Sequence, residues 1–171
     1  MFTGSGIAIA ACVLVLLVAG ALHYGARPAQ HGNLTPGRLN TLISVLLNQG
    51  YSGGTLMFRV RKGEAFLQMT KYVGRKKGGI QLDFPLARWS EKYYDHARTA
   101  LAAAGIAFEE EPTGRTDTKS FLTVDFATDV SVATSVVRLL ASEVLGVDME
   151  HDMVACFQNV SRNPDDRIGL E

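Results

Sequence analysis

The chain has 171 residues, with 17 Lys and Arg against 17 Asp and Glu, so its formal net charge is zero. A neutral chain lacks the basic excess of a general nucleic-acid binder, and we expect no nucleic-acid partner. Its two cysteines, Cys12 and Cys156, lie in different parts of the chain. They exclude an intramolecular disulfide framework and agree with a reducing compartment.

The most apolar segment is GIAIAACVLVLLVAGAL, seventeen residues from Gly6 to Leu22. As a helix it would span about 25 Å, and extension through Phe2 or Tyr24 brings it to the roughly 30 Å of a bilayer core. We therefore expect residues 1–24 to form a transmembrane anchor. The residues that define the expected membrane span are Gly6, Ile7, Val13, Leu14, Leu16, Leu17 and Leu22.

Two other interpretations of this segment stay open. Ala19-Gly20-Ala21 has the small-x-small pattern of a signal cleavage site, but Met1 to Ser5 holds no Lys or Arg and the apolar run is long for a signal core. Ile9 to Cys12 resembles a lipoprotein acylation site, although the longest apolar stretch follows Cys12. Both comparisons favour the anchor.

The positive charges that flank the span, Arg27 and Arg38, lie on its C-terminal side. By the positive-inside rule they predict a single-pass protein of the inner membrane with a cytoplasmic domain. A periplasmic domain, after anchoring or signal cleavage, is the alternative.

Beyond the span we expect a linker over 25–34, one domain over 35–160 and a polar tail over 161–171. The first helix of the domain begins with Thr35 as its N-cap and Pro36 in its first turn, and it ends at Gly50. Its apolar stripe is Leu39, Leu42, Ile43, Leu46 and Leu47.

The apolar period then changes from 3.6 to 2, which indicates strands. The alternation predicts a three-stranded antiparallel meander, with turns at Lys62-Gly63-Glu64 and Gly74 to Gly79 and with Pro85 ending the third strand. The expected strands are 56–60, 65–73 and 80–84.

Further along we expect a helix over 88–104, strands over 106–111 and 120–127, and a helix that begins at Thr128 or Asp129 and stops at Gly146. Met153 to Val160 fits either a sixth strand or a short helix. The predicted fold class is therefore α+β: an N-terminal transmembrane helix, then an α-β-β-β-α-β-β-α domain with an antiparallel sheet packed by helices.

This element order over Thr35 to Val147 resembles the type III secretion chaperone-like architecture, shared with the YbjN-like and TY-chaperone-like families. The resemblance implies helices packed on one side of a twisted sheet, frequent pairing of subunits, and a surface that binds another protein. It implies no catalytic residues. The predicted membrane span distinguishes this chain from the secretion chaperones, which are soluble. A ferredoxin-like domain is the alternative fold, but it requires a helix where this chain has Lys62-Gly63-Glu64.

Charge is unevenly distributed along the chain. Arg59 to Arg98 contains ten Lys and Arg against four Asp and Glu, a balance of +6, whereas Gly105 to Glu171 contains five against thirteen, a balance of −8. Either the two halves neutralise one another within the fold, or they support association with a partner. Arg75, Lys76 and Lys77 form a basic cluster that fits a solvated turn or a contact with anionic lipid.

The predicted helix over 88–104 carries the candidate partner-binding residues Trp89, Tyr93 and Tyr94. Core packing explains Trp89 and Tyr93 equally well, whereas Tyr94 lies about a hundred degrees off the apolar stripe. In Glu109-Glu110-Glu111, at least one carboxylate should face away from the others.

No cofactor, metal or nucleophile motif occurs in the chain. His151 with its acidic neighbours fits a solvated loop, and Cys156 fits a buried thiol. We expect a membrane-anchored protein-binding module, such as an adaptor, a chaperone-like module or an accessory subunit of a membrane complex. Its partners would be membrane lipid through the N-terminal helix and a protein or a second copy. The alternatives are an enzyme with a dispersed site and a periplasmic envelope-associated module.

Overall fold

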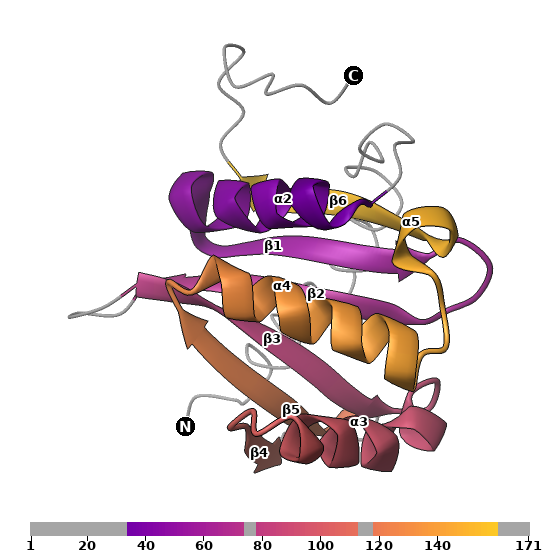
Figure 1. Cartoon of the computed structure of the whole chain (residues 1–171). Helices are drawn as coiled ribbons and strands as arrows, with labels where there is room; N and C mark the ends of the chain where they lie inside the picture. The colour runs from indigo at the N-terminus through magenta and orange to yellow at the C-terminus, as the bar shows by residue number, and fades with distance from the viewer. Residues whose placement is uncertain (1–33, 74–77, 113–117, 161–171) are drawn as a thin grey trace, which may run out of the picture.

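A computed structural model describes residues 34–73, 78–112 and 118–160 as an α+β domain (Figure 1). Six strands form one sheet in the order β4-β5-β3-β2-β1-β6, and every neighbouring pair is antiparallel. The elements are α2 (Pro36–Gln49), β1 (Gly50–Val60), β2 (Phe66–Val73), β3 (Gly78–Ala87), α3 (Glu91–Ala103), β4 (Glu109–Pro112), β5 (Thr118–Ala127), α4 (Val130–Leu139), η1 (Leu140–Val144), α5 (Met149–Asp152) and β6 (Met153–Val160).

The helices α2, α3 and α4 pack on one face of this sheet, which is the face toward the viewer in Figure 1. This arrangement confirms the predicted α+β class and the antiparallel sheet packed by helices. The transmembrane helix, most of the linker, the basic cluster at 75–77 and the tail lie outside the described residues. Within the described ranges, no helix is long and apolar enough to cross a membrane.

The first helix begins and ends as the sequence predicts. The Thr35 hydroxyl accepts a hydrogen bond from the Arg38 N–H at 3.4 Å, and Gly50 follows the last helical residue. A side chain at Gly50 would collide with the Leu46 carbonyl oxygen, because the backbone passes directly from α2 into β1. The last residue of the linker predicted over 25–34 belongs to the domain: only 3% of Leu34 is exposed, and it packs in the core.

The meander is confirmed, but β3 runs past Pro85 to Ala87 and the predicted strand end is wrong. The last pair between β3 and β2 is Asp83 with Gln68, so Pro85 has no β2 residue that needs its missing N–H. The buried Ser90 hydroxyl donates to the Pro85 carbonyl oxygen and accepts from the Ala87 N–H at 2.9 Å. Ser90 therefore fixes the turn that leads into α3.

The second half of the domain contains every predicted helix and strand, with shifted boundaries. Helix α3 begins at Glu91 because residues 88–90 form that turn, and β4 begins at Glu109 rather than Ile106. Asp129 caps α4 by accepting from the Val132 N–H at 2.9 Å. The helix continues as the π-helical η1 and stops before Gly146, which has φ +66°.

The alternative left open at Met153 is resolved as a strand. Strand β6 pairs with β1 from Val60 with Met153 to Thr55 with Gln158, and it forms one edge of the sheet. The short helix α5 precedes β6, where the sequence predicts an acidic loop. Only tertiary pairing with β1 distinguishes strand from helix here.

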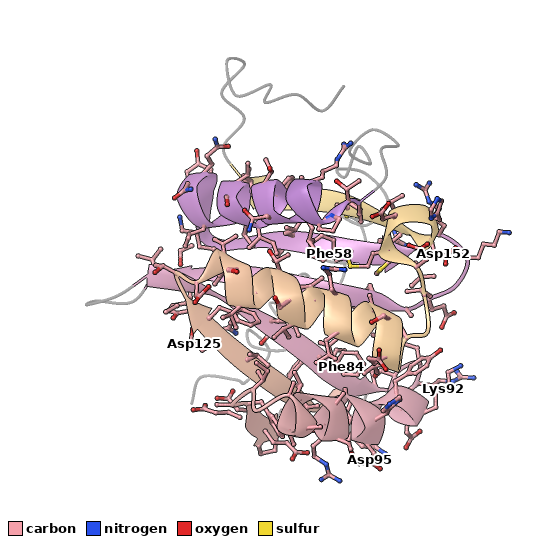
Figure 2. The ribbon with its side chains drawn as sticks, viewed as in Figure 1. Phe58, Phe84, Lys92, Asp95, Asp125 and Asp152 are labelled. Atoms are coloured by element: carbon pink, nitrogen blue, oxygen red, sulfur yellow. The ribbon has the colours of Figure 1, made fainter. Side chains whose placement is uncertain are left out.

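The core lies between the helices and the sheet, where Phe58 and Phe84 are buried (Figure 2). Every second residue of the strands points into this core and packs against the apolar sides of α2, α3, α4 and η1. Fully buried large side chains include Phe58, Phe84, Leu39, Ile43, Leu46, Leu56, Leu67, Met69, Ile80, Leu82, Leu101 and Leu122.

Candidate binding face of the sheet

The other face of the sheet carries none of the helices that the structure describes. We call it the open face and define it by strand register, as the side chains that alternate with the core residues. It comprises Glu109, Glu111, Phe121, Thr123, Asp125, Gln81, Asp83, Phe66, Gln68, Thr70, Tyr72, Thr55, Met57, Arg59, Val154 and Cys156.

Asp83 lies near the centre of the open face, on β3, with its carboxylate partly buried. One carboxylate oxygen accepts from Gln81 Nε2 at 2.9 Å and from the Thr123 hydroxyl at 3.1 Å. The other accepts from the Thr70 hydroxyl at 3.4 Å. Three neighbouring side chains, on β2, β3 and β5, therefore hold this carboxylate in one orientation.

The three groups that donate hydrogen bonds to Asp83 are neutral, and no described Lys, Arg or His lies within ion-pair distance of it. Partial burial raises the pKa of the Asp83 carboxyl, the hydrogen bonds from Thr123 and Gln81 lower it in part, and the negative charge of Glu111 raises it further. The net direction is upward. The open face thus holds a fixed, poorly solvated negative charge at its centre without a described counter-ion.

A second polar contact lies beside it, at the end of the face where β5 ends. The Tyr72 hydroxyl donates to Asp125 Oδ1 at 2.7 Å, and the same oxygen accepts from the Ala127 N–H at 2.8 Å. A Cβ on Gly79 would lie 2.6 Å from the Tyr72 hydroxyl oxygen, so Gly79 leaves the space that the tyrosine crosses. The hydrogen bond to Asp125 raises the pKa of Tyr72. Figure 2 shows Asp125 on β5, toward the end of the strand that lies away from α3.

Carboxylates gather on one half of the open face. Glu109 pairs with Thr123 and Glu111 with Phe121, which places both glutamates on this face, whereas Glu110 points to the helix side. The prediction that the three glutamates do not all face one way is therefore confirmed. Asp83, Asp125, Glu109 and Glu111 make this half acidic, and Arg59 lies across β2 on β1.

The three predicted aromatic residues fall in three different environments. The Trp89 ring, partly buried, lies 4.9 Å from the Phe66 ring and 6.0 Å from the Phe84 ring, measured between centroids. Trp89 therefore packs at the end of the sheet, between Phe66 of the open face and Phe84 of the core. Tyr93 is partly buried against the core, with Lys92 Nζ 4.6 Å from its ring centroid.

The prediction that Tyr94 is a partner-binding residue is wrong, because only 4% of its surface is exposed. Its hydroxyl lies 2.7 Å from the Ser120 hydroxyl oxygen and donates to Glu110 Oε1 at 3.1 Å. Desolvation raises the pKa of Tyr94. Because α3 packs against two strands, it buries residues beyond its apolar stripe. Tyr94 is one of them, and its hydroxyl attaches α3 to β4 and β5.

The helix side has a surface groove of about 460 Å³ between the start of α2, helix α4 and α5. Its charged lining residues are Arg138, Asp148 and Glu150. Asp148 caps α5 and accepts from His151 Nδ1 at 2.8 Å, a contact that lowers the pKa of Asp148 and raises that of His151. Both side chains are more than half exposed, so we interpret the pair as a capping interaction at the surface.

Cys156 on β6 is a buried thiol. Burial raises the pKa of the Cys156 thiol, which keeps it protonated at neutral pH, and its closest polar neighbour is the Met57 carbonyl oxygen at 3.7 Å. Among the described residues, no three His, Cys, Asp or Glu side chains are grouped to hold a metal ion.

The comparisons with known proteins give no relative: no protein-family model, curated protein or solved structure matches the chain. The site must therefore be interpreted from its geometry. The strand predicted over 80–84 contains Gln81 and Asp83, but the sequence does not identify their hydrogen-bond network. The missing information was the register that brings Thr70 and Thr123 beside Asp83.

Proposed function

We propose that this chain is a membrane-anchored protein-binding module without catalytic activity, an adaptor or accessory subunit whose binding surface is the open face. One observation carries the proposal: helices cover one face of a six-stranded sheet, and the centre of the other face holds Asp83 without a described counter-ion. The chaperone-like element order supports the same function. The described groove gives an enzyme no support, because its charged lining residues lie at the surface and Asp148 is occupied by the capping contact with His151.

The occupant that fits this face is a protein segment that presents a lysine or arginine to Asp83. A partly desolvated carboxylate is stabilised when a cation approaches it, and its three hydrogen bonds already fix its orientation. The other carboxylates of the acidic half, Asp125, Glu109 and Glu111, would attract the same segment over a longer range. Phe66 and Trp89 supply apolar contact area at the end of the face.

The membrane part of the proposal rests on the apolar run from Gly6 to Leu22 and on Arg27 and Arg38. One span without an intramembrane charge is suited to tethering and offers no polar pathway across the bilayer. A reporter fused to the C-terminus tests the orientation. Activity of a cytoplasm-dependent reporter is expected, and activity only outside the cytoplasm would assign the domain to the periplasm.

Site-specific photo-cross-linking in cells tests the binding surface. A photoreactive amino acid at Gln68, beside Asp83, is expected to give a discrete adduct with another protein, identified by mass spectrometry. The same amino acid at Thr99, exposed on α3, serves as the control and should give none. Asp83→Asn should reduce the Gln68 adduct severalfold, because it removes the charge and keeps the shape.

Equal adducts at Gln68 and Thr99, or an adduct at Gln68 that Asp83→Asn leaves unchanged, would contradict the proposed surface. Expression and membrane localisation of each variant are measured in parallel, so that loss of protein is distinguished from loss of contact.

A further inference from the structure

We propose that β6 is a dimerisation strand, which pairs antiparallel with β6 of a second copy of this chain. The two edge strands of the sheet, β4 and β6, differ in length and in charge. Strand β4 is four residues long, and its sequence Glu-Glu-Glu-Pro carries three charges and a proline. Charge, proline and short length are the features that prevent an edge from pairing with another chain.

Strand β6 has none of these features. Its eight residues, Met153–Val160, read Met-Val-Ala-Cys-Phe-Gln-Asn-Val, without a charge or a proline. A long, uncharged edge strand is a template for a further strand, and proteins that leave one in place commonly use it. Among the described residues, the strand paired with β6 is β1, on its inner side.

The helix above β6 continues this charge-poor surface. Helix α2 contacts β6, and its fourteen residues include one charged side chain, Arg38. Its outer side carries small or uncharged polar groups such as Gly37, Asn40 and Thr41, all exposed. At the other end of the sheet, α3 and β4 together carry Glu91, Lys92, Asp95, Arg98, Glu109, Glu110 and Glu111. Depletion of charge is typical of the centre of a protein interface.

A second copy of this chain can pair with this edge under two-fold symmetry. A two-fold axis between antiparallel strands is perpendicular to the sheet, so each β6 residue keeps its face across the contact. With the axis at Cys156, the core-side residue Ala155 lies opposite Phe157 of the second copy, and Phe157 lies opposite Ala155. In both copies, the small Ala155 side chain thus lies opposite the large, partly exposed Phe157 side chain. The tail over 161–171 is a poor competitor, since it carries Pro164 and five charged residues.

The consequence for the molecule is a continuous twelve-stranded sheet. Both sets of helices would lie on the same side, and the two open faces would form one surface. An axis at Cys156 places the two cysteines directly opposite each other, where Cα atoms of antiparallel strands are about 4.5 to 5.5 Å apart. That separation lies within the range of a disulfide, so mild oxidation should link the two chains.

The test uses the full chain in detergent with Cys12→Ala, which leaves Cys156 as its one thiol. We expect twice the 18.5 kDa chain mass by light scattering, corrected for detergent, and a dimer-sized band after copper-phenanthroline oxidation that reductant removes. Val154→Lys should give a monomer and abolish the band, because it places a cation on the edge. Thr99→Lys, the same charge on exposed α3, should change neither result.

A monomeric wild-type chain would overturn the proposal, and so would a dimer that neither links through Cys156 nor responds to Val154→Lys. If Val154→Lys fails to fold by circular dichroism, the oxidation result decides alone. The matched probe is Glu111→Cys in a Cys12→Ala, Cys156→Ala chain, on the open face of the charged edge strand β4. A dimer band from this chain as strong as that from Cys156 would show random collision and overturn the assignment to β6.

Discussion

At the scale of single residues, Asp83 is the side chain whose role in stability and proposed role in binding oppose one another. Its carboxyl pKa in the folded domain is raised above the unfolded value, so the folded state binds the proton more tightly. Stability therefore falls as pH rises from the unfolded pKa through the raised folded pKa, and the unfavourable charge is fully present above that window.

Asp83→Asn is accordingly expected to stabilise the domain at pH 7. The asparagine can still accept from Gln81 and Thr123, and its amide can donate to the Thr70 hydroxyl. The advantage over wild type should shrink as pH falls through the carboxyl titration. Urea unfolding at pH 7 and at acidic pH measures it, and the control is Asp95→Asn, an exposed group on α3. A less stable Asp83→Asn domain at pH 7 would show that the charge is compensated.

Thr55, also on the open face, has a buried hydroxyl oxygen with no hydrogen-bond partner in the described structure. Thr55→Val removes the unsatisfied group and keeps the branched shape, so we expect a gain of about 1 kcal/mol in unfolding free energy. Thr123→Val is the matched control on the same face. Its hydroxyl donates to Asp83, and its loss should cost about 1 kcal/mol. Equal effects from the two substitutions would contradict this assignment.

At the scale of elements, Tyr94 attaches α3 to the acidic edge of the sheet through two contacts. Its ring packs on the core, and its hydroxyl forms hydrogen bonds. The Tyr94 ring packs 6.5 Å from Phe84 between centroids, and its hydroxyl reaches Ser120 and Glu110. This one side chain therefore joins α3 to β4 and β5. Strand β4 is short and all its residues are exposed, so it depends strongly on this contact.

Tyr94→Phe is expected to lower the unfolding free energy by about 1 to 2 kcal/mol, because it leaves the buried Ser120 hydroxyl without its partner. Amide hydrogen exchange should accelerate most in Glu109–Pro112. Tyr93→Phe, the same change one residue earlier, should be nearly neutral, since the Tyr93 hydroxyl forms no hydrogen bond with another described residue. Unchanged exchange in β4 after Tyr94→Phe would separate β4 stability from this contact.

The elements also show what local sequence determines and what it does not. The capping by Thr35 and Asp129 and the alternation of Leu56, Phe58 and Val60 follow from neighbouring residues alone, so these features were predicted. Pro85 within β3 and the burial of Tyr94 depend on contacts with residues distant along the chain. The open face was missed for the same reason, because only strand register brings its polar groups together.

At the scale of the whole molecule, the described residues from Leu34 to Val160 form one hydrophobic core between the helices and the sheet. Removal of residues 1–24 should therefore release the chain from the membrane fraction without changing its cooperative unfolding by more than a few tenths of a kcal/mol. Fractionation and thermal denaturation measure the two properties. A truncated chain that remains with the membrane, or one that loses cooperative unfolding, would contradict the division into anchor and independent domain.

The truncated chain also separates two electrostatic roles that the whole molecule combines. The acidic half of the open face should be repelled by anionic lipid, whereas Arg75, Lys76 and Lys77 should be attracted at about 1 kcal/mol per cation near the surface. If the cluster contacts lipid, replacing all three with Gln weakens binding to vesicles rich in phosphatidylserine by about a hundredfold, since about 3 kcal/mol is lost. Vesicles of neutral lipid are the control. Unchanged binding to the anionic vesicles would assign the cluster to a solvated turn and leave the N-terminal span as the proposed membrane contact.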